Sequence, residues 1–360
     1  MRIAILGTGL IGTSIAMAAA RTGDQVSGWD RDAYILARSA QRSGLRPCVS
    51  AEDAVEGAEL IFVCTPVPAL AETAALALRT APDAVVADAG SVKASIIRGV
   101  SDLVSAADLA RFVGSHPMGG SERSGPDAAS ASLLDGAVWV LTPTGVTSPQ
   151  AGDTLESWIT SAGAKPLRMD PVRHDRVVGM VSHLPQVVST SLMGLAARED
   201  EGLPETLVLA AGGFRDLTRL AASNPGLWAE ILLSNREELT GALTLFMDEL
   251  GEMRELLERG DPAALEEALA HATEARKALA ARPKVRAGVG ILQVPIPDRP
   301  GALAQLTAAL SERSVNIEDL QIIHSPEGGR GTVHLTVAGA DLDAATEAAQ
   351  VHGFEAYRIA

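Results

Sequence analysis

The chain has 360 residues, which corresponds to two or three domains at about 150 residues each. Its 45 acidic residues outnumber its 30 Lys and Arg residues, and the formal net charge of −15 argues against a nucleic-acid partner because it repels phosphates. Hydrophobic residues make up 47% of the chain, which predicts folded cores rather than disorder. Two cysteines are too few for a disulfide framework or a multi-cysteine metal site.

One N-terminal segment shares features with a secretory signal peptide. Residues 3–20 carry no charge and end in small residues. However, Gly7, Gly9 and Gly12 interrupt this segment and favour a turn in a folded domain over a continuous apolar helix. No other stretch of the sequence reaches the ~18–20 apolar residues that a membrane span requires. We therefore expect a soluble, cytoplasmic protein without a membrane partner.

Short apolar runs alternate with helical patterns along the first part of the chain. Strands are expected at residues 2–6, 25–29, 59–64, 84–87, 111–115 and 137–141. Nearly continuous apolar strands separated by helices are typical of a parallel sheet that helices cover on both faces. The sequence therefore predicts an α/β domain over residues 1–168.

The pattern changes twice after this domain. Residues 169–284 show long helical periodicity, for example over Leu227–Leu257, which predicts an all-helical domain. Residues 282–288 have the composition of a linker. The tail, residues 289–360, shows the order βαββαβ, with strands expected at 289–295, 315–324, 331–337 and 354–359. This order predicts a ferredoxin-like α+β domain.

A glycine-rich turn follows the first expected strand and opens the first helix. Such glycines permit a tight turn, a close approach of the backbone to a pyrophosphate and close packing of helix on strand. Asp30 ends the second strand, where a carboxylate would hold a ribose 2′-hydroxyl, so a Rossmann-type domain that binds NAD is predicted. Arg31 could pair with a 2′-phosphate instead if Asp30 turned away. The residues of the turn are Gly7, Thr8, Gly9, Leu10, Ile11 and Gly12.

The ends of later strands supply further polar candidates. Because the carboxyl ends of strands in an open α/β sheet line the ligand crevice, Thr65, Pro66 and Ser91 should border the cofactor or the substrate. Turn formation or helix capping explains Thr65 and Ser91 equally well from position alone. His116 follows another strand and could take a hydroxyl proton during hydride removal, since imidazole titrates near neutrality.

Several motifs occur in the order of one enzyme family after the glycine-rich turn. They are Asp88–Lys93, Ser115–Gly125, Ser182–Gln186 and Gly212–Arg219, with Trp228 downstream. In these motifs the chain, from residue 1 to about 280, resembles the prephenate/arogenate dehydrogenases of tyrosine biosynthesis. The resemblance implies NAD-dependent oxidative decarboxylation of prephenate to 4-hydroxyphenylpyruvate, a helical domain for substrate binding and dimerisation, and no metal.

The resemblance also implies roles for single residues. His116 would take the proton of the ring hydroxyl as hydride leaves, and Ser91 would hydrogen-bond that hydroxyl or orient His116. Arg219 would bind the ring carboxylate, because its planar guanidinium suits an anion. The substrate pocket or its polar gate would include His183, Ser121, Glu122, Asp216 and Trp228. From the residues alone, a helix kink at His183, an ion pair at Asp216 and a core position for Trp228 stay open.

Three other functions remain possible at this stage. Arogenate carries an ammonium group where prephenate carries a ketone, and Glu122 or Asp216 near that group would favour arogenate. A dehydrogenase of the β-hydroxyacid type would use a helical Lys, for which the sequence shows no comparable motif. An amino-acid sensor with an inactive Rossmann domain would not need His116, Ser91 and Arg219. The histidines outside these motifs, at positions 174, 271, 324, 334 and 352, show no metal-ligand spacing.

The tail carries a motif of its own. Residues 294–303 and 315–318 resemble the D-x-P-G-x-L…N-I pattern of ACT regulatory domains, which bind amino acids between paired domains. The resemblance implies a homodimer and an amino-acid effector, tyrosine in this pathway. Backbone N–H groups at a helix N-terminus could bind its carboxylate. The alternative is that the tail only dimerises through its edge strands. The expected effector residues are Asp298, Gly301, Ala302, Asn316 and Ile317.

Overall fold

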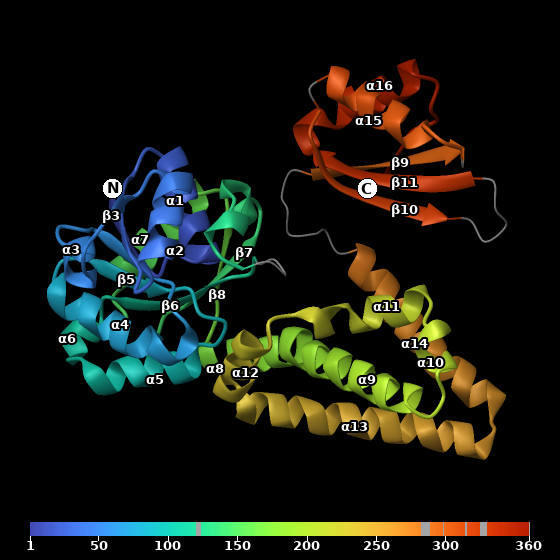
Figure 1. Cartoon of the computed structure of the whole chain (residues 1–360), viewed down its shortest axis with the longest axis horizontal. Helices are drawn as coiled ribbons and strands as arrows, with labels where there is room; N and C mark the ends of the chain where they lie inside the picture. The colour runs from blue at the N-terminus through green and yellow to red at the C-terminus, as the bar shows by residue number, and fades with distance from the viewer. Residues whose placement is uncertain (120–123, 282–288, 298, 314, 325–329, 360) are drawn as a thin grey trace. The chain divides into compact units, whose positions relative to one another are not determined.

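The computed structural model describes residues 1–119, 124–281, 289–297, 299–313, 315–324 and 330–359 (Figure 1). The chain divides into two compact units, Met1–Ala278 and Leu279–Ala360. No helix among the described residues is long and apolar enough to cross a membrane. The domain boundaries expected at residues 168 and 284 stay predictions.

The first unit contains an eight-stranded sheet in the order β3-β2-β1-β4-β5-β6-β7-β8. The six strands from β3 to β6 run parallel, as expected for a Rossmann-type sheet. The carboxyl ends of these strands meet at one edge of the sheet, where the candidate site lies. The strands are β1 (Arg2–Leu6), β2 (Gln25–Trp29), β3 (Arg46–Pro47), β4 (Leu60–Val63), β5 (Val85–Asp88), β6 (Phe112–Pro117), β7 (Val138–Thr142) and β8 (Lys165–Arg168).

Two details of this sheet differ from the sequence-based expectation. Strands β3 and β8 were not expected, because β3 has only two residues and β8 places Pro and Leu between two basic residues. Strand β7 pairs antiparallel with β6. Among the described residues between these two strands, 118–119 and 124–137, the helical elements are the short 3-10 turns η1 (Pro126–Ala128) and η2 (Ala131–Leu134). A parallel pair needs a longer crossover connection, so these short turns fit the antiparallel direction of β7.

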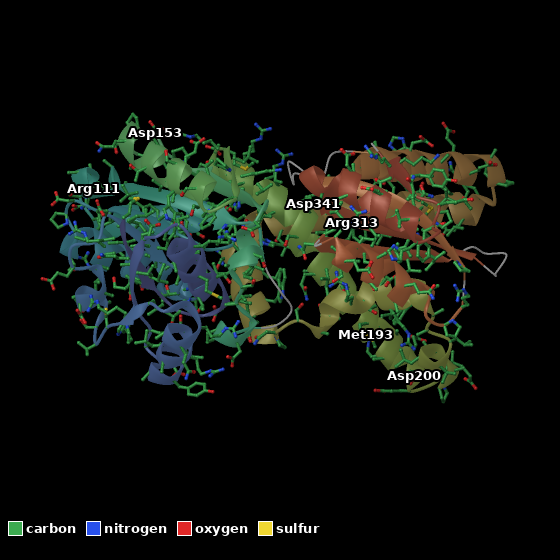
Figure 2. The ribbon with its side chains drawn as sticks, turned by 90° about the horizontal axis from the view of Figure 1, so that it is seen from above. Arg111, Asp153, Met193, Asp200, Arg313 and Asp341 are labelled. Carbon is green, nitrogen blue, oxygen red and sulfur yellow. The ribbon has the colours of Figure 1, made fainter. Side chains whose placement is uncertain are left out.

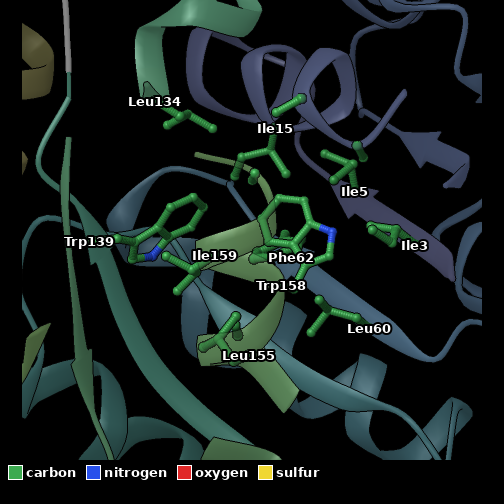
Figure 3. Close-up of a cluster of buried hydrophobic side chains, with 14 of the residues drawn as sticks. Ile3, Ile5, Ile15, Leu60, Phe62, Leu134, Trp139, Leu155, Trp158 and Ile159 are labelled. Atoms are coloured by element: carbon green, nitrogen blue, oxygen red, sulfur yellow. The ribbon is translucent and has the colours of Figure 1, made fainter. Parts of the chain in front are cut away.

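Alternate residues of the strands enter two cores, one on each face of the sheet. Ile5 belongs to the first core and Leu6 to the second. In the first core Phe62 packs against Trp139 and Trp158, with ring centroids 5.8 and 4.6 Å apart (Figure 3). Helices α1 (Leu10–Arg21), α2 (Ala33–Ser43) and α7 (Pro149–Ser161) close the first core; α3 (Ala51–Val55), α4 (Val67–Thr80), α5 (Ala94–Leu103) and α6 (Ala106–Leu109) close the second.

Arg111, which Figure 2 labels, lies directly before β6 and binds the C-terminal end of α4. Its guanidinium donates to the carbonyl oxygens of Leu78, Ala81 and Ala84 at 2.7, 2.8 and 3.0 Å. Leu78 lies in the last turn of α4, whose carbonyls have no partner within the helix, while Ala81 and Ala84 belong to the turn that leads to β5.

The rest of the first unit is helical. Its small core holds Leu184, Leu239 and Ala242, while large apolar side chains such as Val208 and Leu233 are 80% and 71% exposed. Other large apolar side chains on these helices, such as Leu209 and Leu217, are 78% and 66% exposed. The helices are α8 (Pro171–Val178), α9 (Leu184–Asp200), α10 (Glu205–Val208), α11 (Gly212–Thr218), α12 (Pro225–Ser234), α13 (Arg236–Arg259) and α14 (Pro262–Ala281).

A π-helical turn, Gly179–His183, joins α8 to α9. Pro185 lies two residues beyond this turn, and in a regular helix its ring would clash with the carbonyl of Val181. The wider turn avoids that clash, as π-bulges do within α-helices. His183 is the last residue of the turn, so this local irregularity sets its position.

The second unit has the βαββαβ order that the sequence predicts. Its antiparallel sheet has the order β10-β11-β9-β12, and both helices contribute to one buried core. The elements are β9 (Val289–Pro297), α15 (Ala302–Glu312), β10 (Ile317–His324), β11 (Arg330–Ala338), α16 (Leu342–Val351) and β12 (Tyr357–Ile359).

Candidate active site

The glycine-rich turn between β1 and α1 has no room for side chains at two positions. Gly7 has a φ of +94°, and a Cβ there would lie 2.7 Å from the carbonyl of Cys64. A Cβ on Gly12 would lie 2.0 Å from the oxygen of Gly7. Gly9 is the N-cap residue of α1, and a Cβ there would meet nothing within 4 Å. The first turn of α1 has neither a side-chain cap nor an acidic residue, so its N–H groups can bind an anion.

Asp30 links the end of β2 to this turn. Its Oδ2 accepts hydrogen bonds from the Thr8 N–H at 2.7 Å and the Thr8 hydroxyl at 3.3 Å, and its Oδ1 accepts from the Asp32 N–H at 3.0 Å. A carboxylate offers about four acceptor sites, so Asp30 keeps capacity for a ribose hydroxyl. Arg31 is exposed.

Thr65, after β4, carries a buried hydroxyl that has no hydrogen-bond partner. A Cβ on Gly7 would come within 2.8 Å of the Thr65 nitrogen, so this hydroxyl belongs to the residue that adjoins the glycine-rich turn. An unpaired buried hydroxyl is costly unless a ligand or water satisfies it. The tight turn, the open N-terminus of α1 and this hydroxyl together fit a dinucleotide. Pro66 is exposed at the start of α4.

His116 lies at the carboxyl end of β6 and is half-buried. Its Nδ1 is 3.0 Å from Nε2 of His174, which is on α8. Burial is the main cause that holds the pKa of His116 well below 6.5, and the positive charge of Lys93 acts in the same direction. His116 is therefore neutral at neutral pH and able to accept a proton.

Lys93 and Asp88 form a fully buried ion pair near the carboxyl ends of β5 and β6. The Lys93 ammonium also donates to the carbonyl of Ser115 at 2.7 Å, and Asp88 accepts from the backbone N–H groups of Gly90 at 2.9 Å and Ser115 at 3.0 Å. These bonds join the ends of β5 and β6 one residue before His116. Burial lowers the pKa of Lys93, whereas the Asp88 carboxylate opposes this shift.

His174 and Asp175 bring α8 to this site, and the sequence reasoning did not assign them a role. His174 Nδ1 is 2.8 Å from the Asp175 carboxylate. The same carboxylate accepts from the backbone N–H groups of Lys93 at 2.7 Å and Ala94 at 2.8 Å. The sequence signal that could have indicated a role was the adjacent His and Asp in the first helix after the α/β domain. The sequence reasoning tested His174 only as a metal ligand.

His183 and Trp228 lie side by side, with rings edge to face and centroids 6.2 Å apart. The Asn235 side-chain amide donates to His183 Nδ1 at 3.0 Å and to the Asp175 carbonyl at 2.8 Å. Burial lowers the pKa of His183 to about 4, although the Asp175 charge opposes this shift. His183 is thus neutral. Asn235, like His174 and Asp175, is a residue to which the sequence reasoning assigned no role.

The other expected substrate residues are less closely connected to His116. Ser91 is half-buried in the turn after β5. Asp216 and Arg219 are exposed, and Arg219 begins the short η4 helix, Arg219–Ala222. Gln186 Nε2 donates to the carbonyl of Leu220 at 2.9 Å, which ties η4 to the start of α9. Ser121 and Glu122 lie outside the described residues.

The expected effector residues lie in the second unit. Gly301 has a φ of +87°, and a Cβ there would meet nothing within 4 Å. Ala302 is buried, Asn316 is exposed and Ile317 is half-buried, while Asp298 lies outside the described residues. Nowhere in the described part of the chain do three or more His, Cys, Asp or Glu residues form a group that could hold a metal ion.

Comparison with known proteins identifies the family. Three family models match: the prephenate dehydrogenase nucleotide-binding domain over residues 15–167, the prephenate dehydrogenase dimerization domain over 170–271 and the ACT domain over 291–352. The prephenate dehydrogenase of Bacillus subtilis is 30% identical over 349 residues, which cover 94% of this chain and 92% of that protein. The cyclohexadienyl dehydrogenase of Zymomonas mobilis is 35% identical over 282 residues, or 77% of this chain and 95% of that protein.

Solved structures agree with these matches. Prephenate dehydrogenase from Aquifex aeolicus, in complex with hydroxyphenyl propionate and NAD+, has a TM-score of 0.73 and 27% identity, covering 78% of this chain and 98% of that chain. Synechocystis arogenate dehydrogenase has a TM-score of 0.69 and 30% identity, covering 78% of this chain and all of that chain. The chain belongs to the prephenate dehydrogenase family and carries a C-terminal ACT domain.

Proposed function

We propose that this chain is a prephenate dehydrogenase that oxidises and decarboxylates prephenate to 4-hydroxyphenylpyruvate. The observation that supports this most directly is His116, a neutral, half-buried imidazole at the carboxyl edge of the sheet. This edge is where the cofactor and the substrate of a Rossmann-type dehydrogenase meet. The chain is an NAD-dependent dehydrogenase by family.

The cofactor is NAD, which accepts a hydride when it is bound. The open N-terminus of α1 at Gly9 would hold the pyrophosphate, and Asp30 would hold a ribose hydroxyl. Thr65 would find a partner for its buried hydroxyl on the cofactor. An Asp at this position favours NAD over NADP, because a carboxylate repels a 2′-phosphate.

In the proposed reaction, His116 takes the proton of the ring hydroxyl while the carbon that bears it loses a hydride. The bond from the ring to its carboxylate then breaks, carbon dioxide leaves, and the electron pair of that bond makes the ring aromatic. The ring oxygen regains the proton from His116. Arg219 would bind the departing carboxylate, and His183 and Trp228 would line the pocket. Aromatisation makes the reaction irreversible, so the chain must supply mainly positioning and one base.

The decisive experiment compares prephenate and arogenate as substrates, with NAD reduction as the measurement. We expect a higher kcat/KM for prephenate. The alternative is arogenate, and the similarity to an arogenate dehydrogenase and to a cyclohexadienyl dehydrogenase gives it weight. A higher kcat/KM for arogenate would replace prephenate with arogenate in the proposal, and no turnover of either would reject an enzymatic function.

The pH dependence of the reaction should follow from the neutral state of His116. The pKa of His116 is held well below 6.5, mainly by burial. The active form is unprotonated, so kcat/KM should stay constant as pH falls to 6.5 and decline only below it, when the imidazole takes a proton before the substrate can give one. An acid limb of the kcat/KM profile centred above pH 6.5 would contradict this prediction.

We infer that the protein is a homodimer held together by its helical part. The matching family model is named a dimerization domain, and apolar side chains on these helices are widely exposed. A second copy of the chain would cover them. Sedimentation at several protein concentrations measures the oligomeric state.

We further infer that the ACT domain confers feedback inhibition by tyrosine. A chain that ends at Ala281, the last residue of α14, should keep its kcat and lose inhibition by tyrosine, because the proposed catalytic and substrate residues all precede it. Gly301→Val should have the same effect in the full chain by obstructing the N-terminus of α15. Equal inhibition of the shortened chain would mean that tyrosine competes at the active site.

A further inference from the structure

We propose that His174 and Asp175 are positioning residues that hold His116 in the tautomer whose Nε2 is free to take the substrate's proton. The inference rests on the proposed role of His116 as the base and extends it to two residues of the helical part. Three side chains form one hydrogen-bonded row, from the Asp175 carboxylate through His174 to His116.

The direction of the hydrogen bonds follows from the chemistry of the groups. A carboxylate only accepts, so His174 Nδ1 carries the hydrogen in its 2.8 Å contact with Asp175. A neutral imidazole has one hydrogen, which leaves Nε2 of His174 as an acceptor. Nδ1 of His116, 3.0 Å away, therefore donates. The lone pair of His116 is then on Nε2, the ring nitrogen that is not engaged with His174.

Burial and anchoring make this row rigid. His174 and Asp175 are 1% and 3% exposed, whereas His116 keeps part of its surface accessible. The backbone N–H groups of Lys93 and Ala94, at the start of α5, hold both carboxylate oxygens of Asp175. The His174 and His116 rings meet edge to face, at 75°. Only the His116 end of the row can reach a substrate.

This arrangement does more than stabilise the fold. Capping of α5 requires only the Asp175 carboxylate. It does not require the contact of His174 Nε2 with His116, which lies on strand β6. When His116 takes the proton, its positive charge is stabilised through His174 by the Asp175 carboxylate, as in other His-carboxylate pairs. The base is complete only when α8 packs against α5 and β6.

Substitutions of His174 test the proposal. His174→Phe fills a similar volume without an acceptor, whereas His174→Gln can place a polar atom near the position of Nε2. We expect His174→Phe to lower kcat about 10- to 100-fold, with KM and NADH affinity nearly unchanged. The loss should be smaller than the loss of the base itself, because correct orientation accounts for only part of the rate enhancement that a general base provides. His174→Gln should recover most of that loss. A wild-type kcat in His174→Phe, or no recovery in His174→Gln, would overturn the proposal.

A double-mutant cycle separates positioning from a structural effect. If His174 acts through His116, adding His174→Phe to His116→Asn should cause no further loss of kcat. Independent, multiplying losses would show that His174 acts elsewhere. Failure of the base assignment itself has a different signature, since His116→Asn alone would then retain normal turnover.

A measurement on the unmodified enzyme avoids any effect of substitution on folding. The 15N chemical shifts of the His116 ring at neutral pH distinguish a nitrogen that carries hydrogen from one that does not. We expect Nδ1 to carry it and Nε2 to be free. The opposite tautomer would overturn the proposal even if every variant folded normally.

Discussion

Replacing His116 by Asn should lower kcat by about 10²–10⁴, the range expected when a general base is lost. Asn cannot take the hydroxyl proton, yet it is smaller than His and fits the end of β6. Affinity for NAD should change little, because the residues proposed to bind the cofactor lie at the ends of β1, β2 and β4. Steady-state kinetics with prephenate and NADH binding by fluorescence provide the two measurements.

His271→Asn is a matched control for this substitution. His271 is exposed on α14, outside the proposed catalytic and cofactor residues, so this variant should keep kcat with NAD near the wild-type value. Near-normal turnover in His116→Asn would remove His116 from the mechanism. A loss of NADH binding as large as the loss of kcat would instead mean that the substitution disturbs the whole carboxyl edge of the sheet.

Local patterns in the sequence were sufficient to predict most of the fold. Strand β1 and the turn from Gly7 to Gly12 depend on apolar runs and glycine stereochemistry, which are properties of adjacent residues. The reversed direction of β7 depends on what lies between it and β6, and the sequence there gives no clear helix or hairpin signal. Strand β3 has two residues, too few to produce a period.

The candidate site was predictable only in part for the same reason. Motifs indicated His116 and His183, because each lies within a recognisable run. The contact of His116 with His174 joins residues 58 positions apart, and it exists because α8 packs beside α5 and β6. No spacing rule for adjacent residues contains that information. Asn235, which joins His183 to Asp175, depends on the packing of the segment between α12 and α13 in the same way.

The second large effect is expected on stability, when the buried ion pair of Lys93 and Asp88 is broken. Lys93→Met should lower the free energy of unfolding by about 3–5 kcal/mol, because it leaves the charge of Asp88 buried without its partner. Both side chains have no exposed surface, and each also bonds to the backbone around Ser115. Urea unfolding of the variant and the wild type measures the difference.

Two further variants distinguish a buried charge from a general loss of packing. Asp88→Asn combined with Lys93→Met removes both charges and should regain most of the lost stability, since a neutral buried pair carries no uncompensated charge. Arg21→Met breaks an exposed ion pair with Asp135 and should cost only about 0–1 kcal/mol.

The N–H of Lys93 that holds Asp175 belongs to the backbone and survives these substitutions, so the row that orients His116 should persist wherever the fold does. A double variant no more stable than Lys93→Met would show that the lysine contributes through packing rather than charge.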